Sequence, residues 1–280
     1  MTGEHMTKRF QDLNLKDAFL FAAALDDEET CRLVLEMIFG RKIGKVQVNV
    51  EHTILYTSDI HSIRLDVYAS DTAQVDYDIE MQNDSKADLP KRSRYYQGQM
   101  DIAGLKPGED YHDLKPNYVI FICTYDPFGH GLFRYTYEMC CKETEEPLND
   151  GVYRIFLSTK WKNKEDVPEE LVNFLGYIEQ TTDEYVNEHK DDSLKQLHNH
   201  VSRLKKDRKL EGCYMTVEDL LKEQRKEWLE RGMQQGQKES LENVGKLCAL
   251  MNADGRMDEY ISASQSPQQL QKLFKEYGLH

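Results

Sequence analysis

The sequence lacks the patterns that mark secreted, zinc-binding and membrane proteins. Its six cysteines form no C-x-x-C pair, so neither a disulfide scaffold nor a zinc site is expected. No apolar run approaches the roughly 18 residues of a membrane span, and no charged-then-apolar leader is present. These absences predict a soluble protein of a reducing, cytoplasmic compartment with no membrane partner.

Basic residues are scarce relative to acidic ones. The 280 residues include 36 Lys and Arg against 50 Asp and Glu, which gives a formal net charge of −14. Broad, sequence-independent binding of nucleic acid needs many phosphate contacts from Lys and Arg, so this balance disfavours it. A local basic groove, or a metal site built from acidic residues, stays compatible with it. The sequence also has no glycine-rich phosphate loop and no nucleophile elbow.

Two consecutive alternating runs form the centre of the chain. Residues 63–68 and residues 75–82 both alternate apolar and polar side chains, and this period of two predicts half-buried strands. The segment between them, residues 69–74, is short and polar, so the two strands should form an antiparallel hairpin. The hairpin would bring Asp66 close to Glu80.

The predicted hairpin gathers carboxylates on adjacent strands. Glu80 and Gln82 are two residues apart, so their side chains emerge on one face, roughly 6–7 Å apart. Neighbouring carboxylates repel each other unless a cation lies between them or one takes up a proton. Mg²⁺ suits such a site because it prefers carboxylate and carbonyl oxygens, and it can activate a water for attack on a phosphate. The alternative is a solvated strand face, where acidic residues are common.

Asp66 followed by Glu80-x-Gln82 on the next strand resembles the D…(D/E)-x-K core of the PD-(D/E)XK nucleases. The resemblance is closest to the Rpn branch, the recombination-promoting nucleases and transposases, in which Glu-x-Gln commonly replaces Glu-x-Lys. Segments similar to those of this family follow in the same order, at residues 89–97, 105–111, 118–123 and 126–129. The resemblance covers about residues 10–160 and, more weakly, the rest of the chain.

The resemblance implies a fold and an activity. The fold would be α/β: a restriction-endonuclease-like mixed sheet flanked by helices over residues 1–160, followed by an all-helical region at residues 161–280. The activity would be that of a DNA endonuclease that hydrolyses phosphodiester bonds with Mg²⁺, for which Mn²⁺ could substitute. The alternative is a catalytically weak or silent nuclease-like module that assembles partners through its helical tail, which the negative net charge favours.

The resemblance also implies roles for the motif residues. Asp66 and Glu80 would hold the metal, with the main-chain carbonyl of Met81 as a further ligand. Most relatives outside this branch have a Lys in place of Gln82, which would lower the pKa of the attacking water and stabilise developing negative charge. Gln82 is neutral and can only orient the water through a hydrogen bond. The missing positive charge must then come from the metal or from Arg92 or Arg94 of the next helix, or activity is reduced.

That next helix is predicted at residues 86–104, with Pro90 placed near its start. It carries Lys91, Arg92 and Arg94, followed by two tyrosines. Basic residues beside aromatic ones can hold a nucleic-acid backbone, so these three side chains are candidates for DNA binding. A solvated charge cluster is the alternative.

An additional acid precedes the hairpin. Apolar residues at helical spacing predict a first helix over residues 14–25, and residues 16–19 in it resemble the opening motif of the family. A first-helix acid often joins the metal site in this fold, which would give Asp17 that role. A surface carboxylate or a capping contact is the alternative for Asp17.

The remaining elements complete the predicted fold. Alternating or apolar runs predict strands at residues 46–56, 118–125, 133–141 and 152–158, the last two at the edge of the sheet. Cys140 and Cys141 are expected to be at least half buried. Helices are predicted around residues 168–178, 194–204, 217–237 and 244–251 and after residue 266. Pairing of these C-terminal helices between two chains would form a homo-oligomer.

Overall fold

A computed structural model describes residues 8–49, 54–57, 60–63, 67–85, 88–162 and 167–279. It separates into two compact units, Met1–Met215 and Thr216–His280. The first unit contains the sheets together with the helices that cover the main one. The boundary at residue 160, which followed from the resemblance, stays a prediction.

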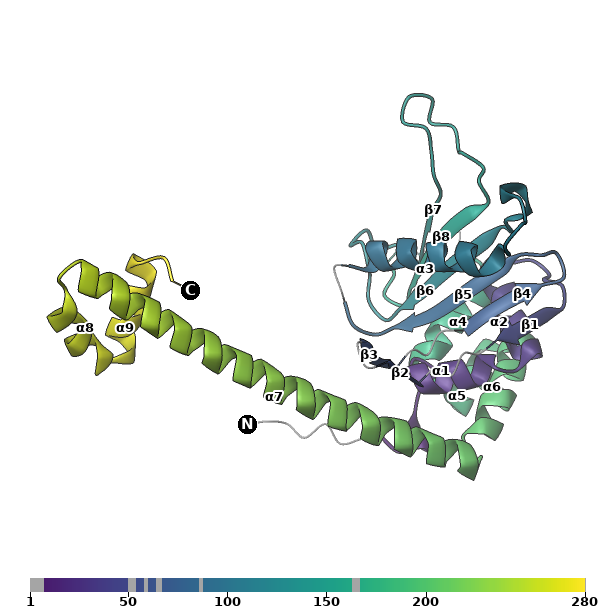
Figure 1. Cartoon of the computed structure of the whole chain (residues 1–280). Helices are drawn as coiled ribbons and strands as arrows, with labels where there is room; N and C mark the ends of the chain where they lie inside the picture. The colour runs from purple at the N-terminus through teal and green to yellow at the C-terminus, as the bar shows by residue number, and fades with distance from the viewer. Residues whose placement is uncertain are drawn as a thin grey trace. The chain divides into compact units, whose positions relative to one another are not determined.

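The main sheet of the first unit has six strands in the order β1-β4-β5-β6-β8-β7 (Figure 1). Strands β4 and β5 form the expected antiparallel hairpin, and β5, β6 and β8 run parallel. The first strand of the hairpin lies later than predicted, because residues 69–71, predicted as turn, belong to β4, and Ile63 pairs with Ile54 in another sheet. A separate sheet pairs β2 (Ile54–Thr57) with β3 (Ile60–Ile63). The strands of the main sheet are β1 (Val46–Asn49), β4 (Val67–Asp71), β5 (Asp76–Gln82), β6 (Asn117–Cys123), β7 (Arg134–Tyr137) and β8 (Val152–Ser158).

Helices cover both faces of this sheet (Figure 1). On one face Tyr96, from α3, stacks on Phe121 of β6. On the other face Phe39, at the end of α2, packs against Tyr77 and Tyr118. The helices of this unit are α1 (Ala18–Leu25), α2 (Glu28–Phe39), α3 (Leu89–Gly104), α4 (Glu169–Glu179), α5 (Asp183–His189) and α6 (Asp192–Leu204), with 3-10 turns η1 (Phe10–Asp12) and η2 (Tyr111–Asp113). The predicted fold, a mixed sheet flanked by helices, is confirmed.

Local sequence accounts for the elements that frame the hairpin. Helix α2 starts at the side-chain cap of Asp27 and ends at Gly40, whose φ of 64° is the left-handed conformation that glycine adopts without strain. Helix α3 has Pro90 in its first turn, as expected. The apolar run of β6 lies between two covered faces and is almost entirely buried, which confirms the predicted strand.

Three sequence predictions about the sheet are wrong. The strand predicted at residues 46–56 is two strands, because β1 joins the main sheet and β2 joins the small one. Strand β8 lies inside the sheet, between β6 and β7, and its buried C-terminal half is apolar on both faces. Cys140 and Cys141 are exposed, because the connection from β7 to β8 projects away from the sheet (Figure 1).

The second unit is helical, as predicted. Helix α7 (Arg208–Ala253) begins in the first unit and continues into the second as one helix, where two helices were predicted. It is followed by α8 (Met257–Ser264) and α9 (Pro267–Glu276). The buried core of this unit consists of Leu247, Met251, Ala263 and Leu273. None of the described helices is both long and apolar enough to cross a membrane.

Candidate functional site

Strand β5 is buried along its whole length. Its even-numbered residues are polar and face α3, whereas its odd-numbered residues are apolar and face α1 and α2. The prediction of a half-buried strand is wrong for β5, because α3 covers the side that alternation would leave to solvent. The polar face of β5 consists of Asp76, Asp78, Glu80 and Gln82.

Arg92, in the first turns of α3, contacts both residues of the Glu-x-Gln motif. Its guanidinium forms an ion pair with Glu80, and its Nη1 donates a hydrogen bond of 2.8 Å to Oε1 of Gln82. Its Nη2 also donates to the hydroxyl of Tyr96 at 3.1 Å, and the ring centroid of Phe121 lies 5.6 Å from its central carbon. One side chain from α3 therefore places a positive charge between Glu80 and Gln82.

The Arg92–Glu80 pair is largely shielded from water. The side chain of Arg92 is 23% exposed and that of Glu80 is 12% exposed. Burial alone would lower the pKa of the Arg92 guanidinium, but the charge of Glu80 and the contacts with Tyr96 and Glu80 together outweigh burial and raise this pKa above its ordinary value. Arg92 is therefore a permanent cation that cannot act as a proton acceptor.

Two further acids share the polar face. Asp78 is 4% exposed and Asp76 is 3% exposed. Ser70 donates a hydrogen bond to Asp76, and burial together with the hydrogen bond to Asp76 raises the pKa of the Tyr68 phenol. Sequence reasoning gave Asp78 no role, although its even number places it on the same strand face as Glu80. The described polar face thus holds the carboxylate of Asp78 two residues from that of Glu80, on the same side of the strand.

The other predicted site residues are Asp66, Lys91, Arg94 and Met81. Asp66 lies outside the described residues. Lys91 and Arg94 are exposed on α3, whereas Arg92 points to the sheet. The carbonyl of Gln82 accepts a hydrogen bond from the Thr124 amide of the segment after β6 at 3.1 Å. The carbonyl of Met81 therefore points the opposite way, toward the side of the β4–β5 hairpin.

Asp17 caps α1 and does not lie in it. Its Oδ1 accepts hydrogen bonds from the backbone amides of Phe19 at 3.1 Å and Leu20 at 3.2 Å. The prediction of a helix from residue 14 is wrong, because the chain turns before the cap and α1 begins at Ala18. The capping contact, one of the alternatives for Asp17, is therefore present. Its role as an additional metal-site acid stays a prediction.

The donors on the polar face fit a hard divalent cation in type. Carboxylates of Glu80 and Asp78 and a main-chain carbonyl of the hairpin are the oxygen ligands that Mg²⁺ and Mn²⁺ prefer. Within the described ranges, no three acidic, histidine or cysteine side chains are grouped so that they could hold a metal ion. Arg92 contributes the positive charge next to Glu80 in this structure.

Comparison with known proteins assigns the chain to a family. The model of the family described as PD-(D/E)XK nuclease family transposase matches residues 19–242, which include the polar face of β5 and α3. The resemblance drawn from the sequence is thereby confirmed. No curated protein and no solved structure matches the chain.

Proposed function

We propose a DNA endonuclease function on the premise that the chain belongs to the PD-(D/E)XK nuclease family of transposases. Membership of this family implies a phosphodiesterase-type hydrolase, and its nucleases generally use divalent metal ions. The proposed reaction is the hydrolysis of a DNA phosphodiester bond at the polar face of β5, with Mg²⁺ or Mn²⁺. A role in recombination or transposition is part of the proposal.

The observation that carries the proposal is the buried contact of Glu80, Gln82 and Arg92 under α3. Asp66 and Glu80 would hold the metal, with the carbonyl of Met81 as a further ligand. When bound, the metal supplies the activation of a water and the polarisation of a phosphoryl oxygen. The attack would be direct, without a covalent intermediate on the protein.

Gln82 and Arg92 would together supply the hydrogen bond and the positive charge that a single Lys supplies in most relatives outside the Rpn branch. The amide of Gln82 would hold the attacking water by a hydrogen bond. The guanidinium of Arg92 would stabilise the negative charge that develops on the phosphate. Its contact with both Glu80 and Gln82 favours Arg92 over Arg94, which is exposed. Lys91 and Arg94 would contact the DNA backbone farther from the reacting phosphate.

The remaining proposals concern partners and compartment. DNA is the proposed partner, and pairing of the C-terminal helices would join two chains. All six cysteines are free thiols, and Cys140 and Cys141 are adjacent and exposed without forming a disulfide. A reducing, cytoplasmic compartment is proposed because the cysteine spacing predicts no disulfide scaffold.

The test is nicking of supercoiled plasmid by the purified chain, with and without Mg²⁺ and Mn²⁺. Glu80→Gln keeps the size of the side chain and removes its charge, so it should lower metal-dependent nicking by about 100-fold or more. Asp66→Ala should do the same.

The matched control is Glu36→Gln. Glu36 is also a buried carboxylate paired with an arginine, but it lies on α2 and contacts Arg32 and Lys42. Its replacement should leave nicking per folded molecule unchanged. Equal nicking by wild type and Glu80→Gln would contradict the site. Absence of nicking under all metals, in a folded wild type, would favour the non-catalytic interaction module.

A further inference from the structure

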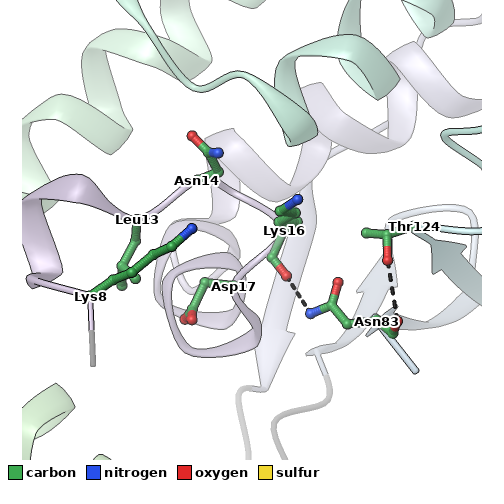
Figure 2. Close-up of a pocket in the computed structure, with 7 residues that line it drawn as sticks. All are labelled: Lys8, Leu13, Asn14, Lys16, Asp17, Asn83 and Thr124. Carbon is green, nitrogen blue, oxygen red and sulfur yellow. Dashed lines mark hydrogen bonds between the residues drawn. The ribbon is translucent and has the colours of Figure 1, made fainter. Parts of the chain in front are cut away.

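A pocket lies at the carboxyl ends of the parallel strands β5 and β6 (Figure 2). It has a volume of about 420 Å³. Asn83 directly follows Gln82 at the end of β5, and Thr124 directly follows β6. Ligands of open sheets with parallel strands bind outside such carboxyl ends. The residues that line the pocket are Lys8, Leu13, Asn14, Lys16, Asp17, Asn83 and Thr124.

Hydrogen bonds join the pocket to the strand that carries the polar face. The side-chain amide of Asn83 donates to the main-chain carbonyl of Lys16 at 2.8 Å, as Figure 2 shows. The segment before α1 is thereby tied to the residue that follows Gln82. Gln82 and Asn83 are consecutive, so their side chains leave the strand toward opposite faces, and a DNA strand that crosses the end of β5 would contact both.

Lys16 is held in place by a carboxylate behind it. Glu179, the last residue of α4, accepts from Lys16 at 2.7 Å and from Lys160 at 2.8 Å. It also accepts from the hydroxyl of Thr159 at 2.7 Å. Burial alone would raise the pKa of Glu179, but these contacts outweigh burial and lower the pKa to about 2. Glu179 therefore stays ionised and fixes the ammonium of Lys16.

The charge balance of this region is positive in a chain whose total charge is −14. Two lysines, Lys8 and Lys16, line the pocket with one carboxylate, Asp17. Outside the lining, Glu179 and Lys160 add one charge of each sign, since Glu179 accepts from both Lys16 and Lys160. The Asp17 carboxylate accepts from two amides at the N-terminus of α1, which offset part of its charge. An acidic protein that binds DNA needs such a local excess of cations, because the whole molecule repels the polyanion.

We propose that this pocket binds a backbone phosphate of the DNA strand, adjacent to the phosphate cleaved at the polar face of β5. Lys8 and Lys16 would supply the ammonium groups that neutralise it. Asn14, Asn83 and Thr124 would complete the polar wall. The assignment rests on the proposed function and adds a second contact point that fixes the strand across Gln82.

The first experiment measures the affinity for a DNA duplex across a salt series, in Ca²⁺ to prevent cleavage. Lys8→Ala and Lys16→Met should each weaken binding at low salt by roughly three- to tenfold, and together lower the log–log salt slope by about 0.9. Lys142→Ala, which removes an exposed lysine from the β7–β8 connection, is the control and should leave affinity unchanged. Equal slopes for the wild type and the double variant would overturn the proposal.

A second experiment locates the phosphate. Single uncharged methylphosphonate linkages are placed one at a time along the duplex, on either side of the position that the wild type cuts with Mn²⁺. One linkage adjacent to the cut should weaken binding of the DNA by the wild type. The same linkage should not weaken binding by the double variant, Lys8→Ala with Lys16→Met, which already lacks the contact. Additive losses at every position would show that the lysines contact no particular phosphate and would overturn the assignment.

The outcomes separate this proposal from the proposed function. If the wild type cuts DNA and the lysine variants bind DNA with the same salt dependence, the phosphate-binding role of the pocket is contradicted and the nuclease proposal stands. A wild type that binds DNA without cutting, with variants that lower the salt slope, supports the pocket and contradicts the nuclease. Binding of inorganic phosphate is the last arm: variants that lose it while DNA affinity stays unchanged would assign the pocket to free phosphate and overturn the proposal.

Discussion

The two faces of strand β5 are buried to the same degree and have opposite chemistry. On one side Tyr77, Ile79 and Met81 pack among apolar residues of the core. On the other side the polar face of β5 lies under α3 and is held by charged and polar contacts, of which the Arg92–Glu80 pair is the centre. The same backbone therefore supports an ordinary core on one side and a buried ionic cluster on the other.

The difference between the two faces shows which of them contributes most to the stability of the fold. Apolar burial stabilises the fold by about 25 cal/mol per Å². A buried ion pair gains much less, because desolvation of both charges offsets their attraction, and apolar residues in its place are often neutral or stabilising. Folding alone would therefore favour apolar residues beneath α3. A cluster of acids there, beside one fixed arginine, is what a site for a metal and a phosphate requires.

The sharpest test of this comparison replaces two neighbouring residues. Ile79→Ala should lower the free energy of unfolding by about 2–5 kcal/mol, because it leaves a cavity in the core, and should keep cleavage per folded molecule. Glu80→Gln leaves the buried guanidinium of Arg92 without its counter-charge, so it should cost about 3–5 kcal/mol of stability as well. Unlike Ile79→Ala, it should also lower cleavage per folded molecule by about 100-fold or more. Denaturant unfolding and plasmid nicking measure the two quantities. If activity falls in proportion to stability in both variants, the polar face is only structural.

Arg92 gives the next largest expected effect. Arg92→Met keeps much of the side-chain volume and removes the charge, which leaves Glu80 buried without its cation. Without metal this should cost about 3–5 kcal/mol of stability, and Mg²⁺ should restore part of that loss because it binds only the folded site. Cleavage in saturating Mg²⁺ should fall by about 10- to 100-fold, because the transition-state charge loses its partner.

A matched arginine tests the reason for that effect. Arg32 pairs with the buried Glu36 on α2, so Arg32→Met should also destabilise the chain. Mg²⁺ should not restore it, since no metal site is proposed there. Thermal unfolding with and without Mg²⁺ makes the comparison. Equal rescue of both variants, or none for Arg92→Met, would show that Glu80 does not bind the metal.

Local patterns in the sequence predicted much of this arrangement. Period two predicted the β4–β5 hairpin, and the continuous apolar run predicted β6, because both depend on neighbours along the chain. Alternation could not predict that the polar face is buried, because it does not say what covers that face. Only the packing of α3 on the sheet brings Arg92 to Glu80, twelve residues earlier in the chain.

Finer signals in the sequence separate Arg92 from Arg94 and favour the capping contact among the alternatives for Asp17. Arg92 is separated from Tyr96 by one helical turn and from Leu89 by three residues, so it shares the side of α3 that packs on the sheet. Arg94 lies on another side. This spacing could have selected Arg92 before the structure. Likewise an aspartate directly before an apolar helix is a common N-cap, which predicts the contact that Asp17 makes.

Replacing Gln82 should have the smallest effect on the cleavage rate. Variants at this position also test where on the polar face the positive charge is needed. Its Oε1 accepts from Arg92, and its Nε2 donates to the carbonyl of Asp84 at 2.6 Å. Gln82→Leu should lower the single-turnover rate by roughly three- to tenfold, because the attacking water loses one hydrogen bond.

Gln82→Lys alone would place an ammonium against Arg92. The combination of Gln82→Lys with Arg92→Ala moves the cation to the position most relatives use, and it should cleave faster than Arg92→Ala alone. If the combination is no faster, the positive charge acts only from α3, and if Gln82→Leu cleaves like the wild type, Gln82 holds no water.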